Sequence, residues 1–566
     1  MLMFGECRFV VIKYIAMKTN KIKFKILKEI LFCIFATASG FAKAEEVLNI
    51  PDVNFKAYLI GNASINTNRD NFIQISEALA FTGTIDCSNK NILDLTGIEA
   101  FGNLGSLYCQ KNKLTSLNIL NLGFLKILNC SYNNLTSLDI SHARFLTRLE
   151  CSDNHLTSLD LFVGTGDFHN SLNYLNCSRN KIKELVVKYT PLVYFYCNSN
   201  LIEVLELSTN SVTGTVLKEL ECASNQLKRL DITLNVNLQI LNCSENPFQY
   251  NFGDTNNLNL KNSKSLRQLI CKDIGFTTAI GNGSQFGLDI SNNTELLVLY
   301  CGGSTLSYLD LSKQTKLTRL AVTQAQLTNL DISKNTALEV LDCYSNKLTS
   351  LDVSKNTDLT DFYCSNNKLT VLNVSKNKAL KILHCDSNQL STLDLYNNIA
   401  LQSLLCFNNK IKSLDISKNT VLTLLQCYSN QFTSLNLKNG RNYALTLMQA
   451  QSNPNLTCIE VDNATNAQNY SNWVKDDIAN YSVNCALSVS NLNKKEISLY
   501  PNPVHDQLNF SEELSEIKIT EFSGKTVKEV SGKGKSLNIS NLAKGIYIIS
   551  ATTKAGKTIN QKIIKD

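Results

Sequence analysis

Residues 338–356 read LEVLDCYSNKLTSLDVSKN, and neighbouring parts of the chain repeat this pattern every 21 residues. A fixed period of this length is typical of a solenoid, in which each coil is one supersecondary unit. The position of Cys343 recurs seventeen times, at Cys87, Cys109, Cys130, Cys151, Cys177, Cys197, Cys222, Cys243, Cys271, Cys301, Val322, Cys343, Cys364, Cys385, Cys406, Cys427 and Ala450.

The first part of each unit predicts a short strand. Leu341 and Cys343 alternate with Asp342 and Tyr344, so the apolar pair points inward and the other two point outward. Asn346 then turns the chain, and its amide is suited to bond backbone groups of adjacent coils that would otherwise be buried unpaired.

The second part of the unit predicts the opposite wall of the coil. Leu348, Leu351 and Val353 supply apolar side chains, and Ser354-x-Asn356 has the chemistry of a turn. Because one coil cannot bury its own apolar side, the coils must stack.

This pattern resembles the leucine-rich repeat, and the cysteine in the strand resembles the cysteine-ladder repeats of the internalin type. The resemblance covers residues 84–457 and implies a β-rich α+β solenoid, a leucine-rich-repeat superhelix with short parallel strands on its concave face. A small helical cap at the amino end and a carboxyl-terminal β-sandwich complete the predicted fold class.

The distribution of charge limits the partners of the chain. The formal charge is +7, but residues 45–490 contain 35 basic and 38 acidic residues, and the excess of basic residues lies at the two ends. Nucleic-acid binding needs a basic face, so we expect none. With 43% hydrophobic and 18% charged residues, most of the chain is expected to be folded.

Residues 1–44 have the pattern of a secretory signal peptide. Lysines between Lys18 and Lys28 precede the apolar run 30–36, and Ala42-Lys43-Ala44 supplies a cleavage site after Ala44. A transmembrane anchor is the alternative, but the apolar run is far shorter than the about 18 residues that a span needs. Met17 is an alternative start of translation.

Fifteen of the nineteen cysteines occupy the inward strand position, while Cys7 and Cys33 lie in or before the signal peptide. Side chains in register on parallel strands stand about 4.8 Å apart, whereas disulfide Cβ atoms lie about 3.8 Å apart. Fifteen is also odd, so the ladder cannot pair completely. We expect free thiols that pack as small apolar groups, as Val322 and Ala450 do in the same position; metal binding by stacked thiolates is the alternative.

The last two cysteines follow the repeats. The run 453–458, Trp473 and Cys485 resemble the closing cap found after such repeats in related bacterial proteins, here over residues 458–490. The resemblance implies a disulfide between Cys458 and Cys485, which would contribute about 3 kcal/mol in the chain-entropy model.

Residues 45–83 are expected to cap the amino end with helices at 54–59 and 76–80, the second with Ser76 or a neighbour as its N-cap. Between them lies an EF-hand-like loop. Its candidate calcium ligands are Asn66, Asn68, Asp70, Phe72 and Glu77. Asparagine replaces the usual first aspartate and the usual glycine, so any calcium site is expected to be weak; a polar turn without calcium is the alternative.

Residues 491–566 lack the Leu-x-Cys unit of the repeats. Their short alternating apolar segments and glycine-containing turns predict a small β-sandwich. The run 500–503 (YPNP), the run 542–547 (LAKGIY) and the lysine-rich end resemble the carboxyl-terminal sorting domain of the Bacteroidetes type IX secretion system. The resemblance implies export through that machinery, with the mature protein secreted or held at the cell surface. A permanent structural or adhesive domain is the alternative.

The outward strand positions carry aromatic side chains, which provide large contact areas for a protein or a sugar. The alternative is that they only stabilise neighbouring strands. The candidate ligand-binding residues are Tyr300, Tyr344, Tyr363, His384, Phe407 and Tyr428 in the carboxyl half, and Tyr174, Tyr194 and Tyr196 in the amino half. Inserted loops at 164–170 and 251–257 are a rival contact surface.

We therefore predict a secreted or cell-surface binding or adhesion protein that recognises an extracellular protein or glycan. The five histidines fall in unrelated repeats or in the last domain, and no nucleophile elbow, zinc motif or phosphate loop occurs, so no enzyme is expected. A structural surface-layer component is the remaining alternative, and calcium is the only cofactor that the sequence suggests.

Overall fold

The computed structural model describes residues 46–163, 167–168, 171–187, 190–207, 216–248, 258–275, 278–280, 285–303, 305–485, 497–521, 523–553, 556 and 558–566. The expected signal peptide and most of the loops 164–170 and 251–257 lie outside these residues. The chain divides into two compact units between Val483 and Asn484, and each unit is described by itself.

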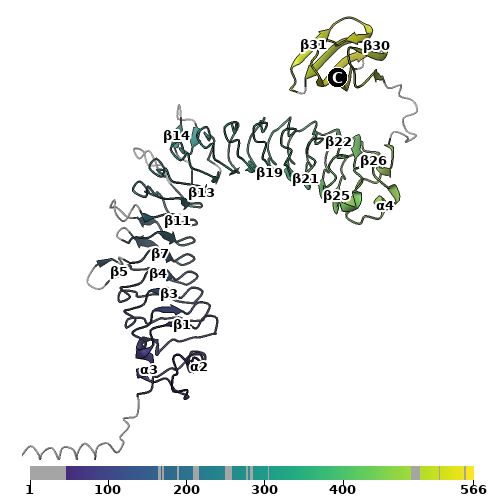
Figure 1. Ribbon diagram of the computed structural model, residues 1–566. Coiled ribbons are helices and arrows are strands. Elements are labelled where there is room, and N and C mark those ends of the chain that lie inside the picture. Colours follow the sequence, from purple (N-terminus) through teal and green to yellow (C-terminus); the bar gives the residue numbers. More distant parts are fainter. Residues whose placement is uncertain are drawn as a thin grey trace, which may run out of the picture. The chain divides into compact units, whose positions relative to one another are not determined.

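The first unit is a solenoid whose coils follow one another along the chain (Figure 1). Within the described residues its main sheet has 18 parallel strands, one per coil. They are β1 (Thr84–Asp86), β2 (Ser106–Tyr108), β3 (Ile127–Asn129), β4 (Arg148–Glu150), β7 (Tyr174–Asn176), β9 (Tyr194–Tyr196), β11 (Glu219–Glu221), β12 (Ile240–Asn242), β13 (Gln268–Lys272), β16 (Val298–Gly302), β17 (Arg319–Thr323), β18 (Val340–Asp342), β19 (Asp361–Tyr363), β20 (Ile382–His384), β21 (Ser403–Leu405), β23 (Leu424–Gln426), β25 (Leu447–Gln449) and β27 (Trp473–Val474).

The predicted cysteine ladder is confirmed. All fifteen ladder cysteines are free and buried. Where the strands are longest the in-register partners are explicit, since Cys271 faces Cys301 and Cys301 faces Val322. Leu341 and Cys343 are both fully buried. The thiols therefore fill the core in single file, as their alternation with outward residues predicted.

The predicted role of the asparagine that lies three residues after most ladder cysteines is also confirmed. Asn367 Nδ2 donates to the carbonyl oxygens of Cys343 and Cys364, at 2.9 and 3.1 Å, and its Oδ1 accepts from the Leu348 amide at 3.0 Å. The residue before it, Asn366, has φ 56°, so the left-handed turn itself lies one position earlier than the sequence indicated.

A second row of buried amides lies at the other corner of the coil, where the sequence indicated only a turn. Asn356 Nδ2 donates to the carbonyl oxygens of Ile332 and Asn335, at 3.1 and 2.8 Å. Unlike the first row, its Oδ1 has no partner within the described residues. The row comprises Asn293, Gln314, Asn335, Asn356, Asn377, Asn398 and Asn419.

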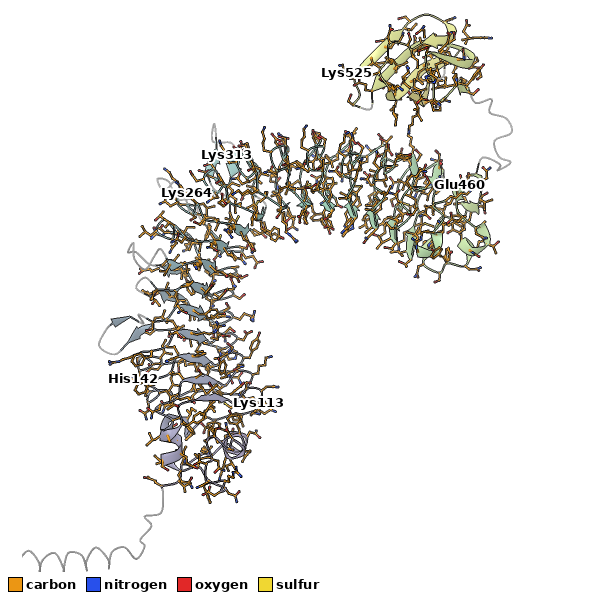
Figure 2. All side chains as sticks on the ribbon, in the orientation of Figure 1. Lys113, His142, Lys264, Lys313, Glu460 and Lys525 are labelled. Atoms are coloured by element: carbon orange, nitrogen blue, oxygen red, sulfur yellow. The ribbon has the colours of Figure 1, made fainter. Side chains whose placement is uncertain are left out.

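The two corners of a coil face different sides of the solenoid. Lys113, just after the first corner, and His142, at the second, project from opposite sides of the coils (Figure 2).

Short strands also line the wall opposite the main sheet. They form one parallel pair, β8 (Glu184–Val186) with β10 (Val204–Glu206), and one parallel set, β22 (Ser413–Asp415), β24 (Ser434–Asn436), β26 (Cys458–Glu460) and β28 (Asn480–Ser482). Two antiparallel hairpins extend from the coils, β5 (Phe162–Val163) with β6 (Asp167–Phe168) and β14 (Thr278–Ile280) with β15 (Gln285–Gly287).

The amino-terminal cap has the two expected helices, α2 (Val53–Gly61) and α3 (Ile75–Ala80), and a single 3₁₀ turn, η1 (Ile98–Ala100), follows in the first coil. Helix α2 buries Phe55 and Leu59, and its N-cap Asp52 also accepts from the Leu93 amide at 2.7 Å. The N-cap of α3 is Gln74, two residues before Ser76, because Glu77 bonds back to the Gln74 amide at 3.1 Å.

The carboxyl-terminal cap adds one strand beyond the seventeen predicted coil positions. Trp473 of β27 pairs with Met448, and its indole nitrogen donates to the Leu445 carbonyl at 2.8 Å. Helix α4 (Ala464–Gln468) and the 3₁₀ turn η3 (Asn442–Ala444) lie nearby in the chain. Cys458 and Cys485 are disulfide-bonded, as the resemblance implied.

The second unit is a six-stranded antiparallel sheet around its own core, which agrees with the predicted β-sandwich. The long strand β30 bends at irregular positions and pairs with four others, which allows the sheet to close over Leu508 and Phe510. The strands are β29 (Leu499–Tyr500), β30 (Gln507–Glu521), β31 (Thr526–Val530), β32 (Gly534–Asn538), β33 (Gly545–Thr553) and β34 (Thr558–Lys565).

Candidate binding surface

The outward side chains of the main sheet, together with the residue after each ladder position, form one continuous surface, here called the sheet face. Parallel register places equivalent residues of successive coils side by side. The central residue of each three-residue strand is buried, while its two neighbours are exposed or partly exposed. Every candidate ligand-binding residue predicted from the sequence lies on this face.

In the carboxyl half, four aromatic side chains of the predicted stripe form two pairs of contacting rings. The Tyr363 and His384 rings meet edge to face at 5.0 Å, and the Phe407 and Tyr428 rings stack at 4.4 Å with 7° between their planes. Rings that stack on each other along the sheet turn their edges, not their faces, to an approaching ligand.

The other two aromatic residues of this stripe lie differently. Tyr344 is 42% exposed. Tyr300 stands apart from Tyr363, because Ala321 and Asp342 occupy the same position on the two strands between them. From Tyr344 to Tyr428 each successive coil carries one ring of the predicted stripe, but ring contacts join only Tyr363 to His384 and Phe407 to Tyr428.

Polar groups between these rings are partly buried and bonded to one another. Burial raises the pKa of Asp342 and lowers that of His384. Asp386 is only 8% exposed and accepts a short hydrogen bond from the Ser365 hydroxyl. His384 Nε2 lies 3.3 Å from Ser403 Oγ. Of these contacts, the one between His384 and Ser403 reaches a ring of the stripe directly.

The amino half brings its three candidate tyrosines into one cluster. The Tyr174 ring centre lies 6.2 Å from that of Tyr194 and 5.5 Å from that of Tyr196. The Arg148 guanidinium carbon lies 3.6 Å from the Tyr174 ring centre, and Arg148 Nε donates to Glu150 at 2.6 Å.

Sequence reasoning selected the tyrosines of this cluster and missed the charged residues around it. Arg148 and Glu150 occupy the outward positions of β4, and Glu219 and Glu221 occupy those of β11. The same alternation that identified the tyrosines also marks these four residues as outward.

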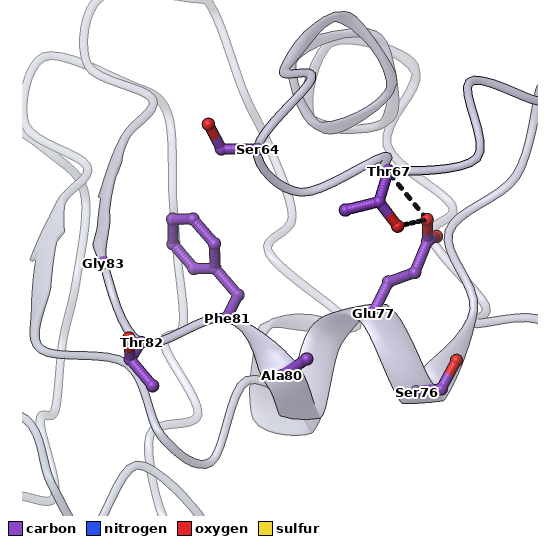
Figure 3. A pocket seen from close by; sticks show the side chains of 8 residues that line it. All are labelled: Ser64, Thr67, Ser76, Glu77, Ala80, Phe81, Thr82 and Gly83. Carbon is purple, nitrogen blue, oxygen red and sulfur yellow. Dashed lines mark hydrogen bonds between the residues drawn. The ribbon is translucent and has the colours of Figure 1, made fainter.

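The EF-hand-like loop lies beside α3, next to an open pocket (Figure 3). Glu77 Oε1 accepts from the Thr67 amide and hydroxyl, at 2.7 and 2.9 Å, and Oε2 from the Gln74 amide. Asp70 accepts from the Phe72 amide at 2.7 Å and from the Asn68 and Gln74 side chains. These bonds lower the pKa of both carboxyl groups against the effect of burial.

This donor set fits a cation only in part. Asn66 Oδ1 is buried without a partner in the part of the chain that the structure describes, but both carboxylates already face N–H donors. A bidentate glutamate ligand would have to give up its bonds to Thr67 and Gln74. Calcium binding through Asn66, Asn68, Asp70, Phe72 and Glu77 stays a prediction beside the alternative of a polar turn.

Calcium binding has a direct thermal test. A ligand that binds only the folded state raises the melting temperature, so millimolar calcium should stabilise the protein relative to a chelator. The Glu77→Gln variant, which removes the charge of the last ligand, should lose this response. Equal melting of the unmodified protein in calcium and in chelator would contradict the site.

Comparison with known proteins agrees with both units. Residues 498–566 match the family described as a secretion system C-terminal sorting domain. The functional domain of InlJ from Listeria monocytogenes, described as including a cysteine ladder, is similar at 21% identity and a TM-score of 0.56, over 92% of this chain and 100% of that chain.

A leucine-rich-repeat protein of Leptospira interrogans is similar at 24% identity and a TM-score of 0.54, over 63% of this chain and 92% of its own. At these identities the likeness shows the fold alone. A search among curated proteins found no significant match. Within the described residues no helix has both the length and the apolar character to cross a membrane.

Proposed function

We propose that this exported chain, a leucine-rich-repeat solenoid with a cysteine ladder and a type IX sorting domain, binds an extracellular protein through its sheet face. The sorting domain places the chain outside the cell or on its surface. The observation that carries the proposal is the unbroken register of 18 parallel strands, which presents one long rigid surface of aromatic and charged side chains. Such rigid aromatic residues bind at low entropic cost.

Two features favour a protein over a glycan as the ligand. Sugars stack on free aromatic faces, but Phe407 and Tyr428 cover each other, and Arg148 covers Tyr174. In addition, tyrosine, phenylalanine and arginine, which all occur on this face, are residue types enriched in protein interfaces. A glycan ligand remains the alternative that the same experiment tests.

The test is an array of extracellular proteins and glycans probed with the exported chain. We expect a protein partner, and we expect changing Tyr344, Tyr363 and Tyr428 together to alanine to weaken its binding by about tenfold or more, since aromatic anchors dominate interface energies. The matched control is Tyr396→Ala, because Tyr396 is 62% exposed but lies in a turn away from the sheet face. Undiminished binding by the triple variant would remove this aromatic stripe from the proposal.

A structural surface-layer component is the second candidate, since repeat surfaces can also self-associate. It requires regular assembly of the purified chain, whereas a binding protein stays monomeric at the same concentration in analytical ultracentrifugation.

We further propose that the chain is not an enzyme. Within the described residues no group of three or more histidine, cysteine or acidic side chains is arranged to hold a metal ion.

A further inference from the structure

In the tyrosine cluster of the amino half, one ring already binds a guanidinium group of the chain itself. Arg148 on β4 lies against the Tyr174 ring at 3.6 Å and bonds Glu150 at 2.6 Å. Asn129 donates to the other oxygen of Glu150 at 3.1 Å. One guanidinium is thus held between an aromatic face and a carboxylate, which is the arrangement that satisfies both its planar surface and its donors.

Tyrosine and glutamate also meet two strands further along, but in a different register, because on β4 and β7 Arg148 is the neighbour of Tyr174 and Glu150 is the neighbour of Asn176. Strand β9 carries Tyr194 and Tyr196, and β11 places Glu219 directly opposite Tyr194 and Glu221 opposite Tyr196. Tyr194 is 40% exposed, and the other three are partly exposed. Each of these two carboxylates is therefore the register neighbour of a tyrosine on the sheet face.

No positive charge of the described chain neutralises these two carboxylates. Glu221 accepts a hydrogen bond from the side-chain Nδ2 of Asn198 at 2.7 Å. Neither glutamate forms an ion pair within the described residues. The segment 208–215, which precedes β11 and lies outside the described residues, contains no lysine or arginine. Two arginines of the preceding coils are engaged elsewhere, Arg148 with Glu150 and Arg179 with Asp153.

Local electrostatics agrees with this charge imbalance. The pKa of Tyr196 is raised by burial, by the Glu219 carboxylate, which also accepts a hydrogen bond from the Tyr196 hydroxyl, and by Tyr174 and Glu221. Glu245, on the turn of the following coil, adds a third carboxylate and accepts from the Ser224 hydroxyl at 2.6 Å. The surface around β9 and β11 therefore presents carboxylates beside tyrosine rings, whereas on β4 the Glu150 carboxylate is paired with Arg148.

We propose that Tyr194, Tyr196, Glu219 and Glu221 form a docking site for an arginine side chain of the partner protein, which would make the two kinds of contact that Arg148 makes, with a tyrosine ring and with a carboxylate. This inference rests on the proposed function and names the chemistry of one contact, an arginine-bearing segment. Arginine is favoured over lysine because its planar group can stack on a ring and donate to a carboxylate at the same time.

The site can be probed without knowing the partner. The probe is a fluorescent octapeptide of alternating glycine and arginine, and its control replaces every arginine by citrulline, which has the same shape without the charge. Fluorescence anisotropy with the exported chain at low and at moderate salt gives the two dissociation constants. We expect the arginine peptide to bind about tenfold or more tightly than the citrulline peptide, with a difference that shrinks as salt rises.

Variants assign that difference to the site. The double change Glu219→Gln and Glu221→Gln keeps size and hydrogen-bonding capacity, and we expect it to reduce arginine-peptide binding to the citrulline level. The matched control is Asp361→Asn, which removes a carboxylate from an equivalent outward position on β19. Tyr196→Leu should weaken binding less, because it removes the ring but leaves both carboxylates. Circular dichroism melting confirms that each variant is folded.

Two results would overturn the inference: equal binding of the two peptides by the unmodified chain, or unchanged arginine-peptide binding by the Glu219→Gln, Glu221→Gln variant. Either result leaves the proposed function standing if the array still identifies a protein whose binding needs Tyr344, Tyr363 and Tyr428. Conversely, an array without any sheet-face partner would contradict the proposed function even if the peptide bound.

Discussion

Alkylation of the native exported chain at about pH 8 is expected to modify none of the fifteen ladder cysteines, whereas the denatured chain should be modified at all fifteen. All fifteen are buried, and only an accessible thiolate reacts. Burial raises the pKa of the Cys87 thiol from 9.0 to about 12, which by itself lowers its thiolate fraction at about pH 8 by about 1,000-fold.

Mass spectrometry of the alkylated peptides measures this result. Cys458 and Cys485 are the internal control, because their disulfide keeps them unmodified in denaturant until a reductant is added. Rapid labelling of the native ladder, or ladder peptides joined by disulfides after denaturation, would contradict a core packed with free, buried thiols.

The choice of pH follows from the sign of the shift. Because the folded-state pKa of each thiol lies above its unfolded value, the contribution of the buried neutral thiols to stability is complete below pH 9.0. It is lost as the pH rises toward about 12, the folded-state pKa of thiols such as Cys130 and Cys177. Labelling at about pH 8 therefore examines the solenoid before alkaline unfolding begins.

The second large effect is expected from Asn367→Ala, which should lower the free energy of unfolding by about 3 kcal/mol. The substitution removes the only acceptor that the Leu348 amide has in the structure, and leaves that N–H buried. It also removes the donors to the Cys343 and Cys364 carbonyl oxygens. Leaving a buried N–H without an acceptor costs more free energy than removing one of several hydrogen bonds that a carbonyl oxygen accepts.

The matched control lies in the same part of the solenoid. Asn356→Ala also removes a buried asparagine that donates to two carbonyl oxygens, but no amide depends on its Oδ1. The chain itself carries an apolar residue at the equivalent position of an earlier coil, Leu122, with the same backbone bonds. We therefore expect a clearly smaller loss from Asn356→Ala.

Urea unfolding followed by circular dichroism compares the two variants. Repeat arrays need not unfold in one step, so the midpoint and the slope are both measured. Equal losses from the two substitutions would contradict the distinct roles that the hydrogen bonds assign to the two amide rows.

The repeats show how much of the candidate surface followed from sequence. Alternation within a strand decides which side chains face outward, so the sequence alone assigns Tyr174, Tyr194 and Tyr196 to one face. Their mutual distances do not follow from it, because the intervals between coils vary in length and only the paired register aligns β7 with β9.

The second amide row shows a different limit of sequence reasoning. Asn356 lies in a sequence typical of an exposed turn, and nothing within one repeat distinguishes it from a solvated residue. Its hydrogen bonds depend on the preceding coil, which supplies the carbonyl oxygens of Ile332 and Asn335. A single repeat cannot show a bond that exists only between repeats.

The sequence by itself therefore determined the solenoid, the inward thiols and the sorting domain, because each depends on a local period or a contiguous motif. The tertiary structure decided which outward side chains meet. It paired Phe407 with Tyr428, set Arg148 on Tyr174, and placed Glu219 and Glu221 beside tyrosines with no ion pair to either glutamate among the described residues. The physical reason is that a period fixes the direction of a side chain, whereas its neighbours across the sheet are fixed only when the coils stack in register.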